Sequence, residues 1–197
     1  MFSFKGFITT EKNTHLEHLE DDIINRGSDG GRNAVNFLKS VRNMLAGSAS
    51  GRVNMSVKWD GAPAIVAGKN PENGKFFVGT KSVFNKTPKI NYTPGDISRN
   101  HSGPVAAKLL VCLRELKRLG INGIYQGDLL FTKGDTKVAN IDGERMITFT
   151  PNTITYAVPL SSALGRKISR ARLGIVFHTY YTGKDMSSLT AGFGTIR

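Results

Sequence analysis

A lysine followed closely by aspartate and glycine is the feature of this sequence with the clearest chemical meaning. In the segment VKWDGAPAIVAG, Lys58 ends a predicted strand, Asp60 and Gly61 form a tight turn, and an apolar strand follows. This arrangement holds the amine at the rim of a sheet, where neighbouring cations can lower its pKa. A nucleophilic lysine must lose its proton, so its pKa must fall by roughly three units from the usual value of about 10.4. The other interpretation is a plain hairpin in which Lys58 is a solvated charge.

Positive charge is concentrated in the same part of the chain. The formal charge is +12, with six Lys and Arg against six Asp and Glu in residues 1–50, and 21 against nine in residues 51–197. An excess of this size favours nucleic acid as a partner through steering and counterion release, although it can also serve solubility alone. The segment GRKISRAR is the densest run, and its cations are the candidate phosphate contacts: Arg166, Lys167, Arg170 and Arg172.

The elements that must position these residues follow from hydrophobic periodicity. A first helix is predicted from Thr14, which has capping-box spacing to Glu17, as far as a stop at Gly27. A second is predicted over residues 33–47, with Val35, Leu38, Val41 and Leu45 forming one apolar stripe. A third is predicted over residues 104–119. The first two form a helical lead-in, residues 1–50, that we expect to pack on a main domain of residues 51–197.

The main domain is rich in predicted strands. Short apolar runs at residues 53–59, 63–68 and 75–80 are separated by turn signals and indicate a meander. Further strands are predicted within residues 123–132, 145–150, 153–158 and 173–181. We therefore expect an α+β fold with two small, mostly antiparallel sheets and flanking helices.

The order of these segments resembles the covalent nucleotidyltransferases, which include DNA and RNA ligases and mRNA capping enzymes. KWDG resembles their first motif, KxDG, whose lysine forms a phosphoamide with a nucleoside monophosphate. FFVGTKSVF follows where the family has a basic residue near the ribose or phosphate. YQGDLLF is similar to a motif that usually reads Gly-Glu-Leu, and LGIVFHTYY to one whose aromatic residue stacks on the purine.

This resemblance implies a ligase-type adenylation domain that uses ATP and Mg²⁺. Lys58 would be the nucleophile and Asp128 the metal ligand, whereas Phe177 would carry the adenine. AMP would then pass to the 5′-phosphate of a nucleic-acid end. The other residues that the resemblance assigns to nucleotide binding are Ser56, Asp60, Gly61, Thr80 and Lys81.

The chain departs from the family pattern at several positions. Pro63 stands where a basic residue is usual, and Ser56 where an acidic residue is usual. The two last family motifs, Glu-Gly-x-Val and Lys-x-Lys, have no convincing counterpart, so we expect the chain to be truncated before them or to be an inactive relative. A non-catalytic nucleic-acid-binding module and a structural phage protein with a basic face are the alternative functions.

Residues 10–194 also resemble an uncharacterised family of large tailed myophages, including cyanophages, in stretches such as NTHLEHLED and NPENGKFFVGTK.

Membrane spanning is not expected, because no run of about 18 apolar residues occurs. Cys112 is the only cysteine, which excludes a disulfide framework and fits a reducing cytoplasm, that of the host if this is a phage protein. His101 and His178 are isolated, and we expect His178 to be a satisfied histidine at a strand edge.

Overall fold

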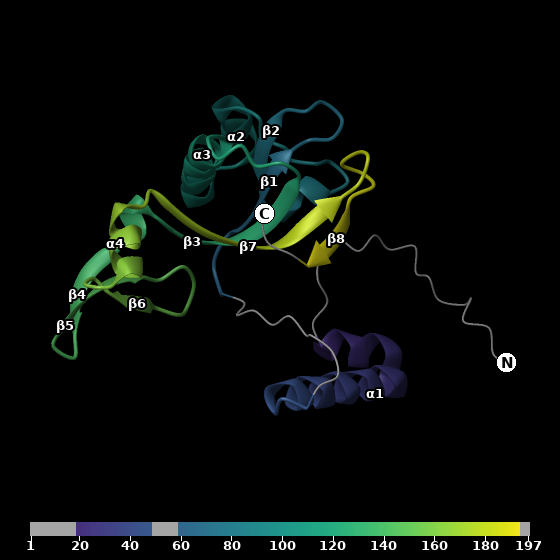
Figure 1. The fold of residues 1–197 in the computed structure, drawn as a ribbon. Coiled ribbons are helices and arrows are strands. Elements are labelled where there is room, and N and C mark those ends of the chain that lie inside the picture. Colours follow the sequence, from purple (N-terminus) through teal and green to yellow (C-terminus); the bar gives the residue numbers. More distant parts are fainter. Residues whose placement is uncertain (1–18, 49–58, 194–197) are drawn as a thin grey trace. The chain divides into compact units, whose positions relative to one another are not determined.

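A computed structural model describes residues 19–48 and 59–193 of the chain. These residues fall into two compact units, a helical unit within 15–58 and a sheet domain that begins at Trp59. Figure 1 shows the elements of both units. Lys58, Ser56, the predicted Thr14 cap and all of the predicted strand 53–59 except Trp59 lie outside the described residues. Trp59 itself is not in a strand.

The helical unit consists of α1 (Leu19–Leu45), which Gly27 interrupts with a non-helical backbone (φ 55°, ψ −125°). The predicted break at Gly27 is therefore confirmed, because glycine adopts positive φ without steric cost. The second helical segment begins earlier than predicted, and Gly30 lies inside it. A Cβ built at Gly30 would lie 1.8 Å from the Asp22 carbonyl oxygen, so the two segments approach each other closely there. The predicted stripe of Val35, Leu38 and Leu45 is exposed.

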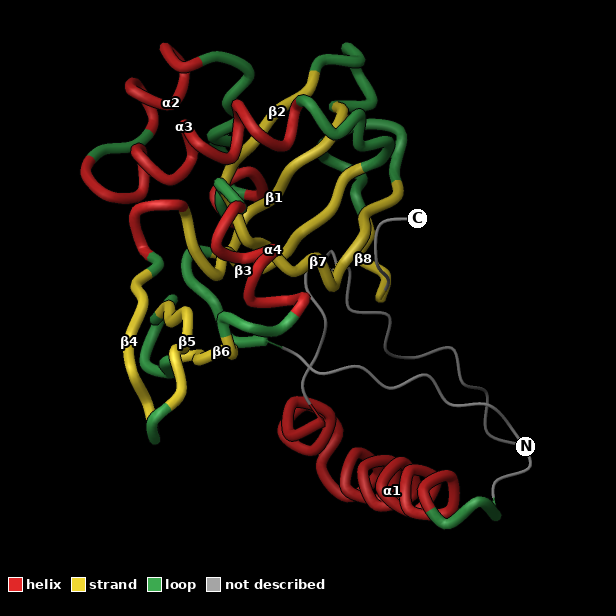
Figure 2. Tube along the Cα trace, turned by 60° about the vertical axis from the view of Figure 1, so that its left-hand side comes forward, coloured by secondary structure: helices red, strands yellow, loops and turns green. Residues whose placement is uncertain are grey.

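The sheet domain is built on a five-stranded antiparallel sheet of strand order β2-β1-β3-β7-β8. Its two central strands, β3 and β7, are also its longest, and both cross the middle of the domain in Figure 2. The strands are β1 (Ala64–Lys69), β2 (Phe76–Gly79), β3 (Ile124–Thr132), β7 (Leu173–Thr182) and β8 (Thr190–Phe193).

Each face of this sheet carries its own core. On one face, the apolar stripe of α3 (Gly103–Lys117) packs against Ile65, Val78 and Leu129, beside the short helix α2 (Pro94–Asn100). On the other face, Val66, Phe77 and Ile124 form a cluster with Tyr181 and the short helical turn η1 (Lys81–Phe84). The strands β1, β2, β3 and β7 each contribute side chains to both cores, which holds the side chains at their ends in defined places.

A second antiparallel sheet has the strand order β4-β5-β6, with β4 spanning Lys137–Ile141, β5 Glu144–Phe149 and β6 Tyr156–Pro159. The turn η2 (Lys133–Asp135) joins β3 to this sheet, and α4 (Ala163–Arg170) leads back to β7. Phe131 from the end of β3 shares a core with Ile147, Phe149 and Ile168, so β3 of the first sheet also packs against the second. The predicted α+β class with two antiparallel sheets and helices is confirmed.

Candidate active site

The described part of the KWDG segment lies where the two sheets meet. Directly before β1, the Ala62 N–H donates to the Leu129 carbonyl oxygen at 3.1 Å, and the Leu129 N–H donates to the Pro63 carbonyl oxygen at 3.2 Å. A Cβ at Gly61 would lie 2.6 Å from the Leu129 carbonyl oxygen and 2.9 Å from the Asp128 Cβ. Glycine is thus the residue that permits this segment to lie directly against Asp128.

Asp60 is held from the other side by the three-stranded sheet. Its N–H donates to the Tyr156 hydroxyl at 3.1 Å, and that hydroxyl donates to the Asp60 carbonyl oxygen at 3.2 Å. The Asn152 side-chain amide donates to Asp60 Oδ2 at 3.1 Å. The rings of Trp59 and Tyr156 have centroids 5.1 Å apart. Both sheets therefore fix the backbone immediately after Lys58.

Asp128 lies on the central strand β3, opposite Ala64 of β1 and Val176 of β7. Its side chain is 13% exposed, and His178 Nε2 lies 3.7 Å from Asp128 Oδ2. Pairing on both sides leaves the carboxylate little backbone freedom. The described site therefore contains one fixed and largely buried carboxylate, Asp128, beside the segment that Lys58 begins.

His178 lies in β7 at a bulge in the pairing with β3, where Gln126 pairs with Thr179 and Gly127 with Phe177. The described pairing of β7 with β8 begins one residue later, at Thr179. The prediction that the polar atoms of His178 are satisfied is wrong for one of them. Its Nδ1 is 2.8 Å from the Thr179 hydroxyl, whereas its Nε2 is buried without a hydrogen-bond partner. A bulge turns a side chain away from strict alternation, and here it turns His178 toward Asp128.

Phe177 belongs to the opposite face of the sheet. It packs against the core beneath α3 and meets Tyr125 edge to face, with ring centroids 6.1 Å apart. Phe177 pairs with Gly127, and successive strand residues point to opposite faces, so Asp128 faces away from it. The structure does not bring Phe177 and Asp128 together on one face.

Thr80 and Lys81 follow β2 at the same end of the sheet as Ala64 and Asp128, because Gly79 pairs with Val66. The Thr80 hydroxyl caps η1 by accepting the Ser82 N–H at 3.3 Å. Lys81 is exposed in the first turn of η1. Thr80 therefore has a structural partner already, whereas the side chain of Lys81 extends into solvent.

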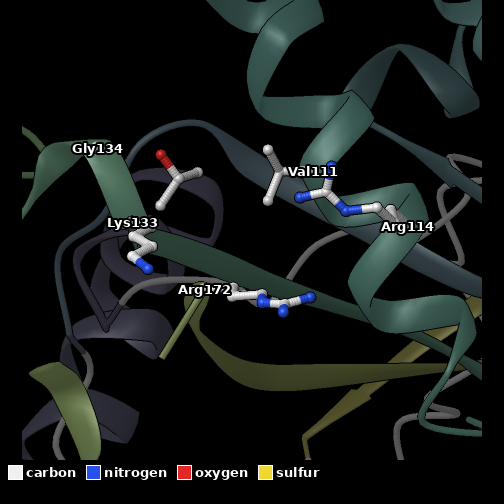
Figure 3. A pocket seen from close by; sticks show the side chains of 6 residues that line it. Val111, Arg114, Lys133, Gly134 and Arg172 are labelled. Atoms are coloured by element: carbon white, nitrogen blue, oxygen red, sulfur yellow. The ribbon is translucent and has the colours of Figure 1, made fainter. Parts of the chain in front are cut away.

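The predicted phosphate contacts are divided between two basic hollows. Arg166, Lys167 and Arg170 of α4 line a hollow of about 430 Å³, and Arg172 lines a neighbouring hollow of about 510 Å³. Sequence reasoning missed Arg114 and Lys133, which share the larger hollow with Arg172 (Figure 3). They come from α3 and η2, so nothing in the local sequence links them to the GRKISRAR run.

Three further observations concern the described residues only. No three of their His, Cys, Asp and Glu side chains lie close enough together to hold a metal ion by themselves. None of their helices is long and apolar enough to cross a membrane. Cys112 is buried in the core under α3, and burial raises the pKa of its thiol to about 12.

Comparison with known protein families places almost the whole chain. Residues 13–197 match the profile of a family of unknown function, DUF6267. The chain belongs to DUF6267. No curated protein and no solved structure matches it. For this DUF6267 protein, function must therefore be argued from the chemistry of its own side chains.

Proposed function

We propose that this DUF6267 protein is a ligase-like nucleotidyltransferase in which Lys58 takes AMP from ATP. The neutral amine of Lys58 attacks the α-phosphorus, a P–N bond forms, and the bond to the β-phosphate oxygen breaks. Pyrophosphate leaves with the bonding electrons, and the amine proton passes to solvent. A 5′-phosphate oxygen of a nucleic-acid end then attacks the phosphorus of lysyl-AMP, so that a phosphoanhydride bond forms, the P–N bond breaks and AMP passes to the nucleic acid. The Lys58 amine leaves and takes up a proton from solvent.

The close approach of Gly61 to Asp128 is the observation that carries this proposal. Lys58 lies three residues before Gly61, and a chain spans at most about 3.6 Å per residue, so its Cα stays within roughly 11 Å of the Gly61 Cα. The long side chain of lysine can bridge much of that distance. The proposal therefore needs only a local turn to bring the Lys58 amine beside the Asp128 carboxylate.

The donor set near Gly61 fits Mg²⁺. Magnesium is held by one or two carboxylates together with substrate phosphates, and Asp60 and Asp128 supply carboxylate oxygens from the two sides of the junction. When bound there, the ion would offset negative charge on the phosphates. Asp128, fixed by strand pairing on both sides, would hold a constant position through the reaction.

The side chains around this junction differ in how well they can contact the nucleotide. Lys81 extends from the correct end of the sheet to contact a phosphate, and Thr80 supports it by capping η1. Phe177 is partly buried on the opposite face of the sheet from Asp128, which argues against its role as the adenine platform. Trp59 and Tyr156 lie beside Asp60 and offer aromatic surface on the site's own side. Two small antiparallel sheets that meet at the KWDG segment suit a ligase-type domain.

Labelling with ATP tests this function. Wild-type protein mixed with radiolabelled ATP and Mg²⁺ should become covalently labelled, whereas Lys58→Ala and Lys58→Arg should not, because neither supplies a neutral primary amine. Asp128→Asn should lower labelling, because an amide is a poorer magnesium ligand. Lys75→Ala, which removes an exposed lysine between β1 and β2, is the matched control and should label normally.

A non-catalytic nucleic-acid-binding module is the second candidate. The two basic hollows favour it, since they require no reaction at Lys58. If wild-type protein takes no label from ATP, NAD or GTP while still binding nucleic acid, this second function replaces the first.

A further inference from the structure

The two basic hollows meet at consecutive residues, because Ala171 lines the smaller hollow and Arg172 the larger. We propose that together they form one contact surface for the phosphate backbone of a nucleic-acid strand, and that Arg114 and Lys133 belong to it. This inference rests on the proposed function in one respect, namely that the bound nucleic-acid strand is the one that accepts AMP. The surface itself is defined by side chains from α3, η2 and α4.

The larger hollow brings together cations from three separate elements. Arg114 belongs to α3 and Lys133 to η2, whereas Arg172 directly precedes β7. Figure 3 shows the three side chains around the same space. The Lys133 N–H donates to the Arg172 carbonyl oxygen at 3.1 Å, which fixes these two residues relative to each other. The backbones that carry Lys133 and Arg172 are therefore held together at the hollow.

One carboxylate, Glu115, is shared by both arginines of this hollow. Its Oε1 accepts a hydrogen bond from Arg114 Nε at 2.7 Å and lies 3.9 Å from Arg172 Nη1. The Arg114 hydrogen bond is also the main reason that the pKa of Glu115 is lowered. A guanidinium has five N–H donors, so each arginine keeps donors free for an anion.

Asp135 does not pair with the cations that line the larger hollow. Its Oδ2 accepts the Thr132 N–H at 2.7 Å and the Thr132 hydroxyl at 2.8 Å, and Lys108 Nζ lies 4.0 Å away. This carboxylate therefore caps η2 and already faces a lysine of its own. Lys133 forms none of the ion pairs in the described part of the chain, so its charge is available to a ligand.

The smaller hollow carries positive charge without any carboxylate partner among the described residues. None of the ion pairs found there involves Arg166, Lys167 or Arg170, and all three residues are exposed. Arg166 also donates to the Ser161 carbonyl oxygen, which holds its side chain along the start of α4. Uncompensated cations on a short helix attract phosphates strongly at low salt.

A nucleic-acid backbone fits this surface better than a small anion does. The cations are spread along two adjoining hollows, whereas a free phosphate or nucleotide needs donors that converge on one point. Among the described residues, no aromatic side chain lines either hollow, so this surface offers phosphate contacts without a platform for base stacking. Binding should therefore depend strongly on salt and little on base sequence.

The test measures binding of fluorescent oligonucleotides, single-stranded and duplex, by anisotropy over a series of salt concentrations. The assay contains no nucleotide, so its result does not depend on whether Lys58 accepts AMP. The double variant Arg114→Gln/Lys133→Gln should bind more weakly, and the slope of log affinity against log salt should fall by about one for each cation removed. Arg166→Gln/Lys167→Gln should lower the slope similarly.

The matched control is Lys75→Gln/Lys184→Gln, which removes the same charge from exposed residues between β1 and β2 and between β7 and β8. It should bind almost as tightly as wild type, and circular dichroism should show that all variants are folded. Equal losses in the control and the Arg114/Lys133 variant would overturn the proposal, because the effect would then be net charge alone. Wild-type affinity that is flat with salt, or a marked preference for one base sequence, would also overturn it.

Discussion

At the scale of single residues, Asp128 and His178 form the least expected pair in the molecule. His178 Nε2 is buried 3.7 Å from Asp128 Oδ2 and has no hydrogen-bond partner. Groups that orient a metal-binding carboxylate typically change metal affinity or activity by about 10–100-fold when they are removed. Under the proposed function, His178 is therefore a positioning residue for Asp128.

We predict that His178→Ala lowers the rate of labelling by ATP and raises the Mg²⁺ concentration that gives half-maximal labelling. The Mg²⁺ titration separates positioning from loss of fold, because a partly unfolded protein would lose amplitude without a change in its midpoint. His101→Ala is the control, since His101 contacts Asn91, which pairs with Val78 of the edge strand β2. An unchanged Mg²⁺ midpoint in His178→Ala would remove the histidine from the site.

Cys112 gives an independent check of the core. Because burial raises its pKa to about 12, almost no reactive thiolate forms near neutral pH. We predict that iodoacetamide leaves the native protein unmodified and modifies it readily in denaturant. Rapid native alkylation would mean that α3 does not pack on the sheet as described.

The same thiol affects how stability depends on pH. Because the unfolded thiol ionises at lower pH than the folded one, the free energy of unfolding is unaffected by this group below about pH 9 and falls as the pH rises toward 12.

At the scale of elements, the pairing of β3 with β7 depends on Gly127. A Cβ there would lie 2.3 Å from the Val176 carbonyl oxygen and 2.8 Å from the Phe177 Cα, and both atoms belong to backbone that cannot move freely. We predict that Gly127→Ala destabilises the protein by about 1–3 kcal/mol, as measured by urea unfolding. Gly134→Ala, at a position with open space around it, should change stability by less than about 1 kcal/mol. Similar midpoints for both variants would contradict the described pairing.

Strands and helices with strong apolar patterns could be predicted from the sequence, and shorter polar ones could not. Periodicity located α3 and the strands β1, β2, β3 and β7. α2 was missed because its Thr93–Asp96 capping box lies in a segment, NYTPGD, that resembles a turn. α4 was missed because Ile168 is its only buried apolar residue. Burial against other elements, which local sequence does not contain, stabilises such short helices.

The candidate site was only partly predictable for a related reason. Motif order predicts that the KWDG segment lies near Asp128, but the close contact of Gly61 with Asp128 depends on strand register. The sequence does not reveal on which face of the sheet Phe177 and His178 lie, because a single bulge in the β3–β7 pairing decides it. Arg114 and Lys133 join Arg172 only through the packing of three elements.

At the scale of the whole molecule, the excess positive charge lies in the later part of the chain. The 21 Lys and Arg residues after position 50 include both the KWDG lysine and all the cations of the basic hollows. Residues 1–50 have balanced charge, with six cations and six anions. We therefore expect nucleic-acid contact to reside in the sheet domain, which carries the basic hollows.

The central claim is that Lys58 becomes covalently joined to AMP beside Asp128. The most direct measurement is peptide mass mapping of the full chain after incubation with ATP and Mg²⁺, with acid-labile phosphoamide bonds preserved by digestion at alkaline pH. The account predicts an AMP adduct on the peptide that contains Lys58, absent from Lys58→Arg and reduced in Asp128→Asn. An adduct on another lysine, or an unmodified Lys58 peptide with ATP, NAD and GTP alike, would contradict it.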